Sequence, residues 1–280
     1  MLKDITIGQY FPLNSVIHRL DPRTKLLYTF VFIITIVLTN NFVSLALCIS
    51  VALAVTFISK VPLKTVIKGL KPILFVIIIT SLLQIIYVKT GVPLISFWKI
   101  KITSGGLLEA VFLTFRISFL IVMSTMLTYT TSPTSMTNGL DRTFAPLTKL
   151  GIDFNIVTMI MTIALRFIPT LIDEVDKIIS AQKSRGANFE SGNIFKRAKM
   201  LIPLFVPLLF NATRRAYELA YAMTCRCYNG GKGKTTMNTL KFKKGDWAAL
   251  LLTVAFVAGI IFLNIKFGEY NAQFTFNLAL

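Results

Sequence analysis

The 34 residues from Leu26 to Ser59 carry no charged side chain, and only the polar turn at 39–41 interrupts them. A helix that crosses a bilayer needs about 20 predominantly apolar residues, because its backbone hydrogen bonds must be satisfied within the segment. We therefore interpret this stretch as two membrane-spanning helices joined by a tight turn. A composition of 54% hydrophobic and 15% charged residues excludes an ordinary soluble protein.

Five stretches in all are apolar enough to span a membrane, and polar or charged segments separate them. The sequence therefore predicts an all-α polytopic membrane protein. A strip at about 91–103, between the third and fourth spans, is amphipathic and is expected to lie at the membrane interface. The predicted spans cover about residues 26–39, 42–59, 72–88, 106–129 and 247–265.

Basic residues are unevenly distributed along the chain. Lys and Arg number 30 against 12 Asp and Glu, and seventeen of the 30 lie between Thr130 and Asp246. Because Lys and Arg accumulate in cytoplasmic segments, we expect the N-terminus and this inserted segment to be cytoplasmic. The predicted organisation is an N-terminal membrane domain over 1–129, helical coupling segments over 130–246, and a last span with its tail over 247–280.

The inserted segment is too apolar for a disordered tail. Its uncharged runs at 154–165 and 200–213 reach only about 18 and 21 Å as helices, short of a bilayer. We expect amphipathic helices along the membrane over about 153–183, 194–212 and 214–227, the last two in one helix or two, after a short helix at about 135–150. A sixth or seventh span is an alternative, if long basic side chains beside these runs extend to the membrane surface.

Two arginines occupy equivalent places in this segment. Arg185 precedes Gly186 at the predicted end of one helix, and Arg226 lies near the end of another, 41 residues later, with Gly230 beyond it. A cation in the last turn of a helix stabilises the helix dipole, which needs no function. A forked guanidinium also suits bidentate pairing with carboxylates of a partner, so both readings stay open.

The sequence offers no pattern for catalysis, a metal or a cofactor. One His and three Cys do not make a metal site or a disulfide framework. The run GGKGKT at 230–235 misses the phosphate-loop spacing, because Tyr228 stands where the first Gly belongs. We expect no enzyme activity. Nucleic-acid binding is not expected either, since membrane topology accounts for most of the basic excess.

Four short motifs resemble those of a known family. They are GQY at 8–10, HRLDPRTKLL at 18–27, ALRFIP at 164–169 and AQKSRGA at 181–187. Together they make the chain similar, over nearly its whole length, to the transmembrane T components of energy-coupling factor transporters, in the CbiQ-like family. The N-terminal motif resembles the vitamin-type module that several substrate-binding proteins share.

The resemblance implies a non-catalytic scaffold in a bacterial cell membrane. Such a scaffold joins two cytoplasmic ATP-binding subunits of the EcfA type to a membrane S component for vitamin or micronutrient uptake. Two Ala-Arg-Gly motifs of the family dock on the ATPases, and they correspond here to Ser184-Arg185-Gly186 and to Cys225-Arg226-Cys227. The second keeps only its arginine, which leaves the helix cap open, with Gly230 as an alternative stop. Contact with the S component is expected at Leu201, Leu204, Phe205 and Leu208.

Two other classes of membrane protein fit the sequence less well. A self-sufficient secondary transporter would show inverted repeats and broken helices, which five spans with one long insertion do not supply. A membrane enzyme would need paired acids, histidines or an activated nucleophile. Within the fourth span, Glu109 and Arg116 are either a polar transport path or, as we favour, an interfacial acid and a cation bound to a polar neighbour.

Overall fold

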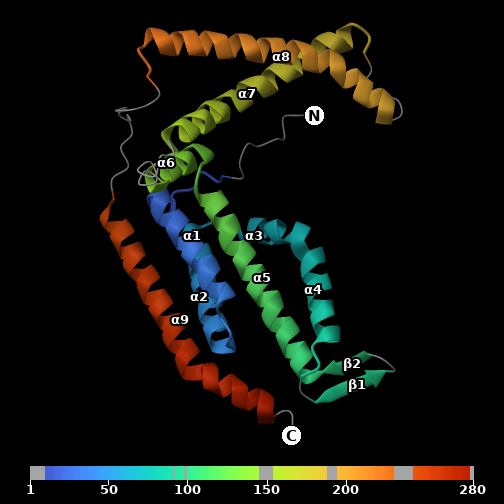
Figure 1. Ribbon diagram of the computed structural model, residues 1–280, viewed down its shortest axis with the longest axis vertical. Coiled ribbons are helices and arrows are strands. Elements are labelled where there is room, and N and C mark those ends of the chain that lie inside the picture. Colours follow the sequence, from blue (N-terminus) through green and yellow to red (C-terminus); the bar gives the residue numbers. More distant parts are fainter. Residues whose placement is uncertain are drawn as a thin grey trace. The chain divides into compact units, whose positions relative to one another are not determined.

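The computed structural model describes residues 10–90, 92–97, 100–144, 154–187, 194–229 and 242–277. It divides into two compact units, one of residues 8–139 with 240–280 and the other of residues 140–239 with 1–7. Figure 1 shows helices throughout, with one short hairpin. The elements are α1 (Pro22–Val37), α2 (Phe42–Ser59), α3 (Leu63–Leu70), η1 (Lys71–Ile73), α4 (Leu74–Tyr87), β1 (Pro93–Phe97), β2 (Ile100–Thr103), α5 (Ser104–Thr130), α6 (Pro133–Phe144), α7 (Phe154–Ser184), α8 (Ile194–Cys225) and α9 (Lys244–Asn277).

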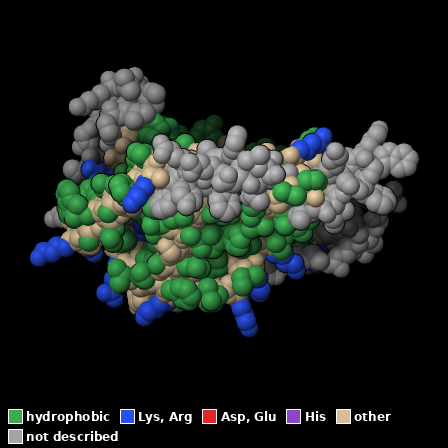
Figure 2. Space-filling model, turned by 90° about the horizontal axis from the view of Figure 1, so that it is seen from below, with side chains coloured by type: hydrophobic (Ala, Val, Ile, Leu, Met, Phe, Trp, Pro, Cys, Tyr) green, Lys and Arg blue, Asp and Glu red, His purple; other side chains and the backbone are tan. Residues whose placement is uncertain are grey.

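Five helical segments of the described chain are long and apolar enough to cross a membrane: α2, α3 through α4, α5, α7, and α9 as far as Lys266. The chain is therefore an all-α, multi-pass membrane protein. The helix α1, expected as a span, has 16 residues and is about 24 Å long, somewhat short for a bilayer. The helix α7 was expected to lie along the membrane. It has 31 residues and is long and apolar enough to cross the membrane. In Figure 2, hydrophobic side chains cover much of the described part of the face that is shown.

Within the first unit, α5 is the helix on which α1, α2, α3 and α4 pack, and α9 packs on α1 and α2. The core between them includes Phe32, Cys48, Met123 and Ile260. Phe32 stacks on Phe256 of α9, with ring centroids 5.8 Å apart. In this unit α4 packs on α5 and the hairpin, so much of its apolar surface stays exposed.

The first turn of α1 holds the start of α9. Asp21 caps α1 by accepting a hydrogen bond from the Arg23 amide at 3.0 Å. The carboxylate of Asp246, only 1% exposed, accepts from the Asp21 amide at 2.8 Å and from the Thr24 hydroxyl at 3.4 Å. Its second oxygen accepts from the Lys243 amide at 2.8 Å, as the third residue of a helix does in a capping box. One buried carboxylate therefore fixes α9 onto α1.

The same turn of α1 also holds the end of α5. The ammonium of Lys25 donates to the carbonyl of Thr130, the last residue of α5, at 2.9 Å and to the carbonyl of His18 at 3.1 Å. Burial, and to a lesser degree the Lys25 charge, lower the pKa of His18, which favours the neutral imidazole. Its Nε2–H donates to the Phe11 carbonyl at 3.0 Å, and its Nδ1 accepts from the Ser15 hydroxyl at 2.7 Å. The C-terminal end of α5 and the N-terminal end of α9 are thus both hydrogen-bonded to the first turn of α1.

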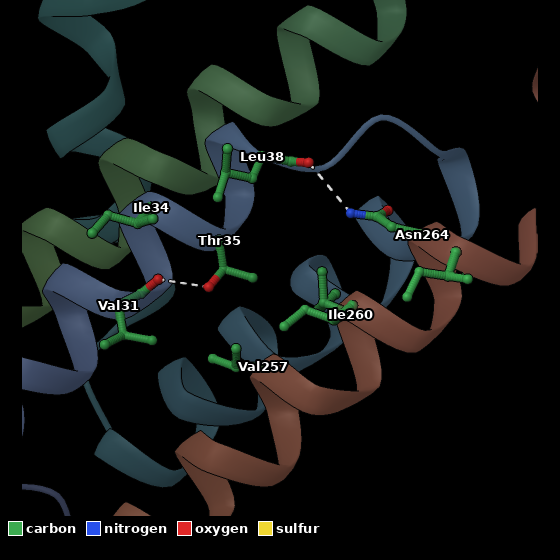
Figure 3. A pocket seen from close by; sticks show the side chains of 9 residues that line it. Val31, Ile34, Thr35, Leu38, Val257, Ile260 and Asn264 are labelled. Carbon is green, nitrogen blue, oxygen red and sulfur yellow. Dashed lines mark hydrogen bonds between the residues drawn. The ribbon is translucent and has the colours of Figure 1, made fainter. Parts of the chain in front are cut away.

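At the opposite end of α1, Asn264 of α9 holds the turn to α2. Its side-chain amide donates to the Leu38 carbonyl at 3.3 Å and accepts from the Ser44 hydroxyl at 2.8 Å. Figure 3 shows Asn264 at the end of an apolar pocket of about 340 Å³ between α1 and α9, with Thr35 bonded within its own helix to Val31. Polar bonds therefore tie these helices at both ends, with apolar packing between.

The two charges of the fourth predicted span each bind a neighbouring segment of the unit. Arg116 donates to the Thr39 carbonyl in the α1–α2 turn and lies over the Phe112 ring, with 4.6 Å between the guanidinium carbon and the ring centroid. Glu109 accepts from the side-chain amide of Gln84 on α4 at 3.0 Å. Arg116 therefore binds a polar neighbour, as the interpretation that we favoured expected, and Glu109 binds the neighbouring helix α4.

Within the strip at 91–103, the strands β1 and β2 pair in antiparallel fashion, with Pro93 opposite Thr103 and Phe97 opposite Ile100. The Thr103 side chain then caps α5 by accepting from the Gly106 amide at 3.2 Å. Apolar residues that alternate with a period of two indicate a β-strand. The amphipathic character of this strip was predicted from the sequence, but its strands were not.

In the second unit, α7 packs on α8, and Arg215 pairs with Glu174 at 3.3 Å. The helix α8 is continuous through Pro203 and Pro207, so the two stretches expected there are one helix. The short helix expected at 135–150 corresponds to α6, which is described as far as Phe144; residues 145–150 lie outside the described residues. The predicted cap at Asp153 lies outside the described residues.

Candidate coupling site

The first candidate motif closes α7 with a complete C-terminal cap. Gly186 has φ +87°, in the left-handed region. Its amide donates to the Lys183 carbonyl at 3.0 Å, and the Ala187 amide donates to the Gln182 carbonyl at 3.0 Å. These two bonds define a Schellman motif, which places the exposed Arg185 at the cap position of the helix.

The second candidate motif closes α8 in the same way. The Cys227 amide donates to the Thr224 carbonyl at 2.9 Å, and the Tyr228 amide donates to the Met223 carbonyl at 3.0 Å. Cys227 itself takes the left-handed conformation, with φ +56°. Arg226 is exposed and therefore stands at the position that Arg185 has on α7. The alternative stop at Gly230 is not used, because α8 ends at Cys225.

Each end thus presents one guanidinium at its cap, just before the chain turns into the left-handed region. Among the described residues, neither Arg185 nor Arg226 forms an ion pair. Both arginines lie at the C-terminal end of their helix. The helix dipole is negative there and favours a cation. Sequence reasoning found both arginines but left the second cap open, because Cys, unlike Gly, gives no signal for a positive φ.

A single substitution tests this geometry. We expect Cys227→Gly to raise the free energy of unfolding by about 1 kcal/mol, because Gly takes a left-handed φ without the steric cost that a Cβ brings. Thermal unfolding of the purified protein in detergent measures the shift. Gly186→Ala is the matched opposite change and lowers stability by a similar amount. A destabilised Cys227→Gly variant would contradict the assigned cap.

The four residues expected to meet the S component lie on α8, with different exposures. Phe205 is 62% exposed, whereas Leu204 and Leu208 are half-buried, and the side chain of Leu201 lies outside the described residues. An exposed apolar and aromatic strip, the α8 strip, runs along the helix beside Phe205. Its other members are Ile202, Val206, Leu209, Phe210, Tyr217 and Tyr221.

Comparison with known proteins identifies the family. The CbiQ family model, described as "Cobalt transport protein", matches residues 13–237. This chain belongs to the CbiQ family. The matched range of the CbiQ family contains both arginine caps, and it stops before α9.

Relatives within the family extend the match over almost the whole chain. A protein of Ruminiclostridium cellulolyticum is 44% identical over 268 residues, which cover 95% of this chain and all of the relative. A protein of Clostridium kluyveri is 43% identical, and one of Bacillus subtilis is 39% identical, each matched over its full length. All three are named energy-coupling factor transporter transmembrane protein EcfT. This CbiQ-family chain is therefore similar to these transporter components over almost its whole length.

Proposed function

We propose that this chain is the transmembrane scaffold of an energy-coupling factor importer. It would join two cytoplasmic ATP-binding subunits to a membrane S component that binds a vitamin or another micronutrient. The chain itself would have no catalytic role, and ATP hydrolysis would take place in the partner subunits. The names of the full-length relatives support this assignment.

The pair of matching helix ends is the observation that carries the proposal. A scaffold that engages two similar ATP-binding subunits needs two similar contact points. The caps of α7 and α8 provide them, with the same pair of hydrogen bonds and an exposed arginine at the same position. A guanidinium there can pair in bidentate fashion with carboxylates in a groove of each ATPase.

The distribution of charge supports the orientation that this function requires. The N-terminus and both arginine caps would face the cytoplasm of a bacterial cell, since residues 1–25 and the polar parts of 130–246 hold most of the basic residues.

The proposed mechanism transmits motion through α7 and α8. ATP binding closes the two ATPases, and the arginine caps move with them. The Glu174–Arg215 pair and the packing of α7 on α8 make the two helices one element that can move between two arrangements. The α8 strip, with Phe205 in it, would pass this motion to the S component, which then turns to release its substrate inward.

Co-purification tests the proposal most directly. The affinity-tagged chain, expressed in its own host, should retain two ATP-binding proteins and a small membrane protein after detergent extraction. An Arg185→Glu, Arg226→Glu variant should lose the ATP-binding proteins while it retains the membrane protein. A chain that purifies alone and still transports a solute in vesicles would instead be a self-sufficient transporter.

A further inference from the structure

The helix α3 and the residues that flank it carry four lysines that neither the fold nor the proposed coupling uses. Lys60 precedes the helix, Lys64 and Lys68 lie on it, and Lys71 follows it. All four are exposed, and none forms an ion pair with another described residue. The sequence has no Asp or Glu between Asp21 and Glu109, so no acid close in sequence balances their charge.

Packing against α5 fixes which sides of α3 stay free. Val66 is buried in a cluster with Val122 and Tyr129 of α5, and the Tyr129 hydroxyl donates to the Thr65 carbonyl at 3.4 Å. A Cβ at Gly69 would lie 2.8 Å from that hydroxyl, so Gly is needed for this close approach. The helix is therefore held on α5 by one face.

The free sides of α3 divide into a basic and an apolar stripe. Lys64, Lys68 and Lys71 follow one another at spacings of four and three, which puts them on one side of the helix. Leu63 and Ile67 form the neighbouring stripe, 49% and 65% exposed. An apolar stripe beside a lysine stripe is typical of helices that lie in the plane of a membrane interface.

The position of α3 in the bundle fits that interface. Tyr129, which α3 touches, stands one residue before the end of α5, where Thr130 binds Lys25. This is the end of the unit at which the buried ionic groups of α1 and α9 gather. In Figure 1, α3 runs across the direction of α4 and α5, after which η1 turns the chain into α4.

We propose that α3 is a binding site for anionic phospholipids. Leu63 and Ile67 enter the boundary between headgroups and acyl chains, and the ammonium groups of Lys60, Lys64, Lys68 and Lys71 bind phosphate headgroups beside them. Charge complementarity selects this occupant, because a surface of four uncompensated lysines attracts anionic lipid by electrostatic interactions that add up over the cluster. The site is independent of the arginine caps.

Brominated lipids test the proposal on the full chain. Ile67→Trp, in a background with Trp98→Phe and Trp247→Phe, places a single fluorescent reporter on α3. The protein is reconstituted into phosphatidylcholine vesicles that contain brominated phosphatidylglycerol or, in parallel, brominated phosphatidylcholine. We expect phosphatidylglycerol to be enriched at the reporter by about fivefold or more at low salt, and less at high salt.

Two matched variants separate charge from packing. Replacement of the four lysines by Gln should reduce the enrichment to none, while replacement by Arg should retain it. A reporter at Ile78→Trp, on the exposed face of α4, should show no preference. Equal quenching by both lipids at position 67 would overturn the proposal. So would the absence of quenching by either lipid, which would place α3 in water or against another protein.

Discussion

Uptake driven by ATP is expected to stop when Arg185 and Arg226 are both replaced by Glu. Each substitution removes the guanidinium of a proposed pair and leaves an acid facing the carboxylates of an ATPase. Loss of one partner of a hydrogen-bonded charge pair at an interface costs about 2–5 kcal/mol, so each change should reduce coupling by at least about 30-fold. Transport of a labelled vitamin into vesicles that hold the complete complex measures the effect.

The controls for this double variant separate docking from folding. Binding of the vitamin by the S component should be unchanged, because substrate recognition lies in another polypeptide. Charge reversal at two other exposed cations of the same helices, Lys177→Glu and Arg214→Glu, should leave uptake close to that of the parent. Undiminished uptake in the Arg185 and Arg226 double variant would remove the basis for the coupling assignment.

The second large effect is expected at Asp246. Asp246→Ala leaves two backbone amides and the Thr24 hydroxyl without their buried acceptor. Each such group costs about 1–3 kcal/mol, so we expect a loss of at least about 3 kcal/mol. For a chain of this size that loss lowers the Tm by about 6 °C or more.

Thermal unfolding in detergent, with the same detergent and protein concentration throughout, checks this expectation. Asp246→Asn keeps one acceptor oxygen and should lie between the parent and the Ala variant. Asp173→Ala, at an exposed carboxylate of α7, should leave the Tm within about 1–2 °C of the parent. An Asp246→Ala variant as stable as the parent would show that the contact between α1 and α9 contributes little.

The spans could be predicted from the sequence because hydropathy over about 20 residues is a local property. Residues 42–59 became α2 with the predicted bounds, and 106–129 lies within α5. The contact of Asp246 with Asp21 could not be predicted, because 225 positions separate them and no local pattern joins them. The helix expected at about 153–183 became α7, but its capacity to cross a membrane was underestimated, since only the uncharged run at 154–165 was counted toward a span.

The candidate site shows the same limit on a smaller scale. Ser184-Arg185-Gly186 carries its own cap signal, because Gly favours a positive φ. Cys225-Arg226-Cys227 carries none, and only the backbone bonds of Cys227 and Tyr228 reveal that it is the same motif. Likewise, the sequence did not distinguish the exposures of the expected contact residues: Leu204 and Leu208 are half-buried on α8, whereas Phe205 is 62% exposed.

The bonds from the first turn of α1 to Thr130 and to Asp246 have a mechanical consequence. Within the unit of residues 8–139 and 240–280, the last turn of α5 and the first turn of α9 are both anchored by the same five residues, Asp21 to Lys25. A displacement of the first turn of α1 would therefore shift the end of α5 and the start of α9 together, so these two helix ends behave as one joint.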